Sequence, residues 1–376
     1  MNTPHALPGM SRHALSTTLL LVLALPSGAV AQVSTAPAFP GEEWEYVSRQ
    51  DLAAYGWDSG RLQSAFAFVR DSSNATGLVV VDRGRIVFDF GDVEELSYIA
   101  SGRKSILAML YGDWVEKGII DLDATLGDLG MDDIGGLLDI EKQATVRDLL
   151  TARSGVYHPA SYSGDDLGQA PPRGSQKPGS YMLYSNWDFN AAGYVFELLT
   201  GRDIYDEIQS QLAIPMQFQD WDRSAQAKAG NLTVSRYAAY PMWLSTRDMA
   251  RVGLVMLNEG NWNGEEIIPP EWARRITAVV TPLEEMNPVS RRDSFLGYGH
   301  LWWIFDGPTA TGPFEGAYWA WGVWGQWIAV FPALDMVVAH KTNNAYERQT
   351  SLDSWHRTLE LILEAKGVKV DAYPWR

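Results

Sequence analysis

Apolar residues recur every three or four positions in several stretches of the chain, which is the spacing of one helical face. In residues 102–117, Ile106, Leu110 and Trp114 follow one another at intervals of four, and Gly118 ends the pattern. The same spacing predicts further helices over residues 58–70, 188–200, 245–259 and 347–366.

Other stretches carry runs of β-branched and aromatic residues between turn signals, a pattern typical of strands. Residues 77–81 and 86–88 flank the polar turn 82–85 and predict a β-hairpin. Strand character returns late in the chain, at 298–305, at 318–330 and, after a turn at 332–335, at 336–340.

Strands therefore lie near both ends of the chain, with mainly helix and loop between them. We expect a single α/β (α+β) domain over residues 32–376. Its sheet would come from about 43–118 and 291–376, with a mainly helical region, about 119–290, inserted between the two parts.

The first 31 residues have the features of a secretory signal peptide. Arg12 precedes an apolar run at 15–25, and Ala29-Val30-Ala31 gives a small-x-small cleavage pattern before Gln32. A membrane anchor is the alternative, although the apolar run is shorter than the ~20 residues that a span needs. We expect cleavage after Ala31, export to the periplasm or beyond, and no stable membrane span afterwards.

Composition removes several classes of function. The 376 residues carry 30 Lys and Arg against 46 Asp and Glu, a net charge of −16, which argues against nucleic-acid binding. Cysteine is absent, so disulfides, thiolate metal sites and a cysteine nucleophile are excluded. The histidines show no ligand spacing, and we expect neither a metal nor another cofactor. Nothing in the sequence indicates the oligomeric state.

Ser101 and Lys104 form an S-x-x-K motif at the start of the helix predicted over 102–117. Residues three apart on a helix share a face, so the hydroxyl and the ammonium can approach each other. The helix N-terminus also favours a developing oxyanion. Taken alone, the motif is better explained by a serine N-cap followed by a solvated lysine.

A second motif is Tyr184-Ser185-Asn186, just before the helix predicted over 188–200. A tyrosine beside a lysine can act as a general base, and an asparagine can bind both a substrate carbonyl and the lysine. A turn with an asparagine N-cap explains the same residues. A third motif, Ala320-Trp321-Gly322-Val323-Trp324-Gly325, places glycines in a strand pattern, either for close approach of a ligand or in a twisted core strand.

Together the three motifs resemble serine β-lactamase-like and penicillin-binding-protein-like hydrolases, in the class C branch with its esterase and 6-aminohexanoate-dimer hydrolase relatives. Further segments are similar to that family: Leu149-Leu150-Thr151-Ala152-Arg153-Ser154-Gly155, the Pro178-Gly179 stretch before Tyr184, and Leu244-Ser245-Thr246-Arg247-Asp248-Met249-Ala250. The resemblance covers about residues 75–345 and implies an antiparallel sheet flanked by helices.

The resemblance also implies residue roles. Ser101 would be the acylated nucleophile, Lys104 would hold or shuttle its proton, Tyr184 would be the base, and Asn186 would orient Lys104 and the substrate carbonyl. The backbone N–H groups of Ser101 and Val323 would form the oxyanion hole.

The family's third triplet normally begins with Lys or His, whereas the matching triplet here, Ala320-Trp321-Gly322, has no cation. We expect this triplet to line the substrate site, and its form resembles the esterase and amide-hydrolase relatives. The leading interpretation is an exported serine hydrolase of a small ester or amide. A β-lactamase or D-amino-acid peptidase is the first alternative, and a catalytically silent ligand-binding protein is the second. Several rings would wall the pocket or belong to the core: Trp187, Trp302, Trp303, Trp321 and Trp324.

Overall fold

A computed structural model describes residues 37–162 and 164–376, and the predicted signal peptide lies outside them. The helices are α1 (Ser59–Ser72), α2 (Gly102–Glu116), α3 (Val146–Leu150), α4 (Asn186–Thr200), α5 (Ile204–Glu207), α6 (Thr246–Leu257), α7 (Pro270–Ile276) and α8 (Leu352–Ala365). The strands are β1 (Gly77–Asp82), β2 (Arg85–Gly91), β3 (Ser97–Tyr98), β4 (Trp243–Leu244), β5 (Asn261–Trp262), β6 (Glu265–Glu266), β7 (Leu296–Tyr298), β8 (Trp303–Phe305), β9 (Tyr318–Gly322), β10 (Gln326–Phe331) and β11 (Met336–Lys341).

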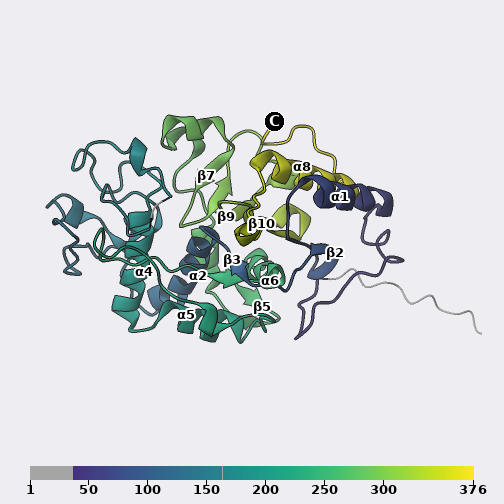
Figure 1. The fold of residues 1–376 in the computed structure, drawn as a ribbon, viewed down its shortest axis with the longest axis horizontal. Helices are drawn as coiled ribbons and strands as arrows, with labels where there is room; N and C mark the ends of the chain where they lie inside the picture. The colour runs from purple at the N-terminus through teal and green to yellow at the C-terminus, as the bar shows by residue number, and fades with distance from the viewer. Residues whose placement is uncertain (1–36, 163) are drawn as a thin grey trace, which may run out of the picture. The chain divides into compact units, whose positions relative to one another are not determined.

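Seven of these strands form one antiparallel sheet in the order β2-β1-β11-β10-β9-β8-β7. Strands from the two ends of the chain meet inside this sheet, where β1 pairs with β11 and Leu78 lies opposite His340. Helices α1 and α8, also from opposite ends, lie side by side (Figure 1). The predicted fold class, an antiparallel sheet flanked by helices with a mainly helical region between the two sheet-forming parts, is confirmed.

Successive side chains of β10 point to opposite faces of the sheet, and both faces are covered by helices. Trp327 stacks on Trp355 of α8, with ring centroids 4.8 Å apart. The next residue, Ile328, faces Gly253 of α6, where an added Cβ would lie 3.0 Å from its side chain. Glycine at this helical position therefore lets α6 lie directly against the sheet.

The late strands differ from the sequence prediction in one respect, because two of the three predicted strands are hairpins, whereas 336–340 lies in the single strand β11. Residues 298–305 contain the turn between β7 and β8, and 318–330 contain the turn between β9 and β10. In the second turn, Trp324 has φ 69° and Gly325 has φ 108°. The turns carry bulky apolar side chains instead of polar ones, so the hydrophobic pattern runs through them without a break.

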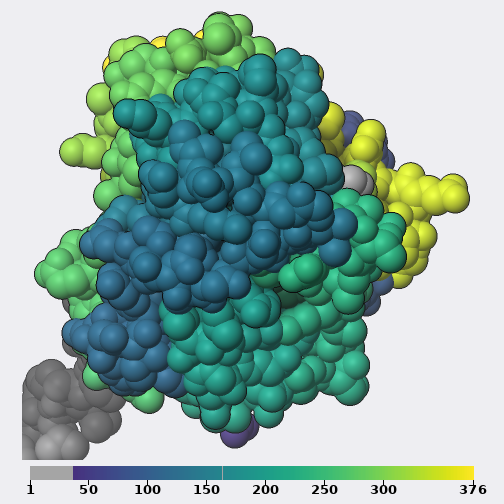
Figure 2. All heavy atoms as spheres, turned by 90° about the vertical axis from the view of Figure 1, so that its left-hand side faces the viewer, coloured from purple at the N-terminus to yellow at the C-terminus, as the bar shows by residue number. Residues whose placement is uncertain are grey.

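The segment between α2 and α6 packs against the sheet-bearing part and forms most of the face shown in blue and teal in Figure 2. Its longest helix, α4, contacts α2 and α3. No helix in residues 37–162 or 164–376 is long and apolar enough to cross a membrane.

Candidate active site

Ser101 lies at the turn that leads into α2. Ala100, just before it, has φ 49°, a left-handed conformation that bends the chain into the helix. Ser101 takes the N-cap position, yet its hydroxyl makes no capping hydrogen bond. The oxygen instead accepts a hydrogen bond from Lys104 Nζ at 3.1 Å. The arrangement therefore differs from a serine N-cap followed by a solvated lysine.

Lys104 is the centre of a buried polar cluster. Its side chain is almost fully buried, with 1% of its surface exposed. Besides Ser101 Oγ, Nζ donates to the phenolic oxygen of Tyr184 at 2.6 Å and to Asn186 Oδ1 at 2.7 Å. The rings of Tyr184 and Phe189 lie 4.2 and 4.3 Å from Nζ. All four residues of the predicted catalytic set are thus brought together around one nitrogen.

Burial changes the protonation states within this cluster. Desolvation, reinforced by the nearby guanidinium of Arg103, lowers the pKa of Lys104 well below its usual value. Desolvation also raises the pKa of Tyr184 to about 12, against the opposing effect of its hydrogen bond with Ser101. At neutral pH these shifts favour an uncharged amine on Lys104 and a protonated phenol on Tyr184.

Several contacts hold the Tyr184 segment in place. The Asn186 backbone N–H donates to Asp165 Oδ2 at 2.9 Å, and the Asp166 N–H donates to the Tyr184 carbonyl at 3.0 Å. The Tyr184 ring stacks on Trp303 with centroids 5.4 Å apart. Residues 165–166 and the start of β8 therefore fix the phenol beside Lys104.

Gly322 brings β9 against the segment that precedes Ser101. A Cβ added at Gly322 would lie 2.4 Å from the Ile99 carbonyl oxygen and 3.1 Å from Ala100 Cβ. No other residue type fits without moving the strand. Val323 follows directly and lines the same cavity as Ser101.

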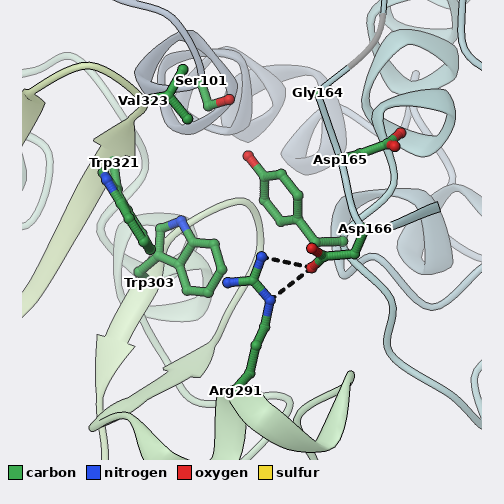
Figure 3. A pocket seen from close by; sticks show the side chains of 9 residues that line it. Ser101, Gly164, Asp165, Asp166, Arg291, Trp303, Trp321 and Val323 are labelled. Atoms are coloured by element: carbon green, nitrogen blue, oxygen red, sulfur yellow. Dashed lines mark hydrogen bonds and ion pairs between the residues drawn. The ribbon is translucent and has the colours of Figure 1, made fainter. Parts of the chain in front are cut away.

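The cavity above Ser101 has a volume of about 260 Å³. It is lined by Ser101, Gly164, Asp165, Asp166, Tyr184, Arg291, Trp303, Trp321 and Val323. Figure 3 shows Ser101 and Val323 close together, Trp321 and Trp303 below them on the same side, and Asp165 and Asp166 across the cavity. Arg291 pairs with Asp166 through two of its nitrogens, at 2.6 and 2.7 Å from Oδ2.

The third predicted triplet divides between cavity and core. Trp321 lines the cavity. Ala320 is 1% exposed and does not line it, and Gly322 faces Ile99. Trp321 is therefore the member of the triplet whose side chain lines the cavity.

The five tryptophans predicted to wall the pocket or to belong to the core also divide between the two places. Trp303 lines the cavity along with Trp321, whereas Trp187 and Trp302 are fully buried. Trp324 is 38% exposed and packs near Tyr98, with ring centroids 6.2 Å apart.

Three residues that line the cavity were not predicted from the sequence: Asp165, Asp166 and Arg291. Arg291 and Asp166 are 125 residues apart, and neither belongs to a recognisable motif. In residues 37–162 and 164–376, no group of three or more His, Cys, Asp or Glu side chains is arranged to hold a metal ion.

Comparisons with known proteins agree with this architecture. The Beta-lactamase family model matches residues 49–361. An uncharacterized protein of Alkalihalophilus pseudofirmus is 22% identical over 272 residues, 66% of this chain and 73% of that protein.

Solved structures share the fold at low identity. A protein of Bacillus anthracis provisionally assigned as a 6-aminohexanoate-dimer hydrolase has a TM-score of 0.59 and 18% identity, covering 80% of each chain. EstCE1, a hydrolase with promiscuous acyltransferase activity, has a TM-score of 0.57 and 18% identity over 84% of this chain and 98% of its own. A penicillin-binding protein of Bacillus halodurans has a TM-score of 0.57 and 16% identity over 79% of this chain and 99% of its own.

A serine and a lysine one helical turn apart, met by a tyrosine from a second segment beneath an antiparallel sheet, define a serine hydrolase. The chain belongs to the Beta-lactamase family, whose model spans most of its length. It is a β-lactamase-related serine hydrolase.

Proposed function

We propose that the protein is exported and cleaves carboxylic esters or small amides through an acyl-enzyme on Ser101. The observation that carries the proposal is the three-way contact of Lys104 Nζ with Ser101, Tyr184 and Asn186, at 3.1, 2.6 and 2.7 Å. A lone, solvated lysine would not need such partners, whereas a proton-transfer site does.

Hydrogen-bond chemistry limits how protons are arranged around Lys104. The Asn186 carbonyl oxygen can only accept, so it takes one N–H of the neutral amine. One N–H and one lone pair then face Ser101 and Tyr184. When the Ser101 hydroxyl points at the lone pair, Lys104 can take its proton directly. The sequence favoured Tyr184 as the base, but a phenol whose pKa is about 12 is a poorer acceptor than this amine.

Acylation then proceeds by attack of Ser101 on the substrate carbonyl. Ser101 Oγ bonds to the substrate carbonyl carbon as its proton passes to Lys104. The bond to the leaving oxygen or nitrogen breaks, and the leaving atom keeps the electron pair and takes the phenolic proton of Tyr184. Lys104 returns its proton to Tyr184. Deacylation runs the same transfers in reverse, with water as the nucleophile.

The developing oxyanion would be held by two backbone N–H groups, those of Ser101 and Val323. Ser101 stands at the N-terminus of the 15-residue helix α2, where the helix dipole favours negative charge. Val323 is set beside it by the close contact of Gly322 with Ile99. One such donor contributes about 10²–10³ in kcat in related chemistry.

Esters and small amides are favoured because of the cavity lining. The family cation is replaced by Ala320, which is buried and outside the lining, and Trp303 and Trp321 supply apolar walls. The structural similarity to EstCE1 and to the assigned 6-aminohexanoate-dimer hydrolase supports the same substrate classes.

A β-lactamase or peptidase activity is the second candidate, and Arg291 is the observation that favours it. Its guanidinium lines the cavity and would supply a cation from a different element. Asp166 already pairs with it, which reduces its attraction for a substrate carboxylate.

Turnover of ethyl and 4-nitrophenyl esters, a 6-carbon amide and a penicillin separates these candidates, with Ser101→Ala as the control. We expect ester turnover to exceed penicillin turnover at least tenfold, and the reverse order would select the second candidate. N-terminal sequencing of protein from the periplasm tests export, and a start at Gln32 is expected.

A further inference from the structure

A second cavity adjoins the catalytic one. Its volume is about 390 Å³, within the range of small-molecule sites. Arg291, Trp303 and Trp321 line both cavities, so these three side chains separate them. The rings of Trp303 and Trp321 meet edge to face, with centroids 5.3 Å apart.

Aromatic side chains make up much of the second cavity's wall. Phe295, Trp319, His356 and Trp375 line it, together with the aliphatic side chains of Leu296 and Leu352. Polar groups are present as well, from Ser290, Ser294, Asp293 and Arg376. Such a mixture suits an apolar group that enters from a polar rim.

The outer wall is built by residues 373–376, which are firmly attached to α8. Trp375 Nε1 donates to Glu360 Oε1 at 3.0 Å, and Arg376 donates to both oxygens of that carboxylate at 2.8 and 2.7 Å. Glu360 is 2% exposed. The Trp375 ring lies between those of His356 and Tyr373, with centroid distances of 4.9 and 5.4 Å. The wall is therefore formed before any ligand arrives.

We infer that the second cavity binds the leaving-group side of the substrate, and that the protein prefers esters of hydrophobic, aryl-bearing alcohols. This inference rests on the proposed function. The group that protonates the leaving oxygen must lie on the leaving-group side of the scissile bond. That group is Tyr184, whose ring stacks on Trp303, and Trp303 is a wall of the second cavity.

The alcohol portion therefore leaves the scissile bond past Tyr184, toward the wall of Arg291, Trp303 and Trp321 that the two cavities share. A phenyl ring on a short alkyl linker can then stack among the aromatic residues of the second cavity. Burial of its apolar surface strengthens binding in the transition state for acylation.

Two acetate esters test the preference, because they form the same acetyl-enzyme and their alcohols have similar intrinsic reactivity. These are ethyl acetate and 4-phenylbutyl acetate. We expect a kcat/KM ratio of about 30 in favour of the aryl ester, from the surface that the ring buries. The ratio should fall about tenfold in Trp375→Ala, which opens the wall, and in Leu352→Trp, which fills the cavity at a 41% exposed position.

Trp114→Ala is the matched control. Trp114 also donates its Nε1 to a glutamate, Glu207 Oε1 at 3.1 Å, but it lies thirteen residues beyond Ser101 on α2. Its loss should leave the ratio as in the wild type. A ratio near one in the wild type, or an equal ratio in all variants, overturns the inference. A loss confined to esters with a long acyl chain overturns the leaving-group assignment.

Binding of 4-phenyl-1-butanol, measured by calorimetry, separates this inference from the proposed function. Binding that weakens tenfold in Trp375→Ala, with no ester turned over, would uphold the cavity and refute the proposed hydrolysis. Ester turnover with no detectable binding of the alcohol and no preference for the aryl ester would uphold the proposed hydrolysis and refute the role of the second cavity.

Discussion

The Nζ atom of Lys104 lies 2.6 Å from the phenolic oxygen of Tyr184, and both side chains are buried. This contact joins α2 to the segment before α4, across 80 residues of sequence. Burial lowers the pKa of Lys104 and raises that of Tyr184 to about 12. Both shifts favour the uncharged forms, an amine that can accept one proton beside a phenol that can donate another.

The pH dependence of kcat/KM follows from these shifts. Protonation of Lys104 removes the base, so activity should fall on acidification, with a midpoint well below the usual lysine pKa of about 10.4. Tyr184 should keep its proton up to pH 10, because its pKa is about 12. An ester assay from pH 5 to 10 should therefore show one rising limb and then a plateau. A decline between pH 8 and 10 would contradict a neutral Lys104 as the base.

The charge of Arg103 should set the pH at which kcat/KM rises on the acidic side of the profile. It is 2% exposed, its guanidinium lies 4.7 Å from the Tyr240 ring, and Nε has no hydrogen-bond partner in residues 37–162 or 164–376. After desolvation, its charge is the next cause of the lowered pKa of Lys104. Arg103→Met should therefore raise that pKa and move the acidic limb to higher pH.

The conservative variant Arg103→Lys retains the positive charge and should leave the limb close to its wild-type position. Arg103→Met with an unmoved limb would show that this charge does not tune Lys104. Circular dichroism would verify that both variants fold.

Gly322→Ala should slow catalysis because its Cβ would lie 2.4 Å from the Ile99 carbonyl oxygen. The strand must shift and carry the Val323 N–H away from Ser101. We expect kcat to fall about 10²–10³-fold, the effect of losing one oxyanion donor. Gly41→Ala is the control, since its Cβ would meet only Gln217 Oε1, at 4.0 Å. Equal rates in the two variants would remove Val323 from the proposed oxyanion hole.

Three histidines, of which His300 and His340 are buried and His356 is half-buried, should make the fold sensitive to mild acid. Desolvation lowers the pKa values of His300, His340 and His356 to about 4 each. A histidine with a lowered native pKa binds fewer protons when folded, so its contribution to stability is complete above about pH 6.5 and is lost toward pH 4. The Tm should fall between pH 7 and 5, with a smaller slope in His340→Gln. A Tm that is constant over this interval would be inconsistent with neutral buried histidines.

The sequence could predict the local parts of this site. Ser101 and Lys104 share a face because residues three apart on a helix do so. The pairing of Lys104 with Tyr184 and Asn186 spans about 80 residues, and it could be expected only from the resemblance of the three motifs to one family. Runs of β-branched and aromatic residues located β1, β2 and β11, because turn signals bound them.

The remaining features depend on tertiary packing that leaves no local pattern. The β9–β10 turn carries Val323 and Trp324, and apolar residues in a turn are read as strand. Arg291 meets Asp166 from 125 residues away, and no spacing rule connects the two. The division of the tryptophans into cavity and core likewise depends on which face of each strand the neighbouring helices cover.

The most direct test of the account is the intact mass of the protein after brief exposure to 4-nitrophenyl butyrate, measured beside Ser101→Ala. The account predicts one butyryl adduct on the wild-type protein, located by peptide mapping on Ser101, and none on the variant. Release of 4-nitrophenol by both proteins at the same rate, with no adduct on either, would contradict an acyl-enzyme on Ser101.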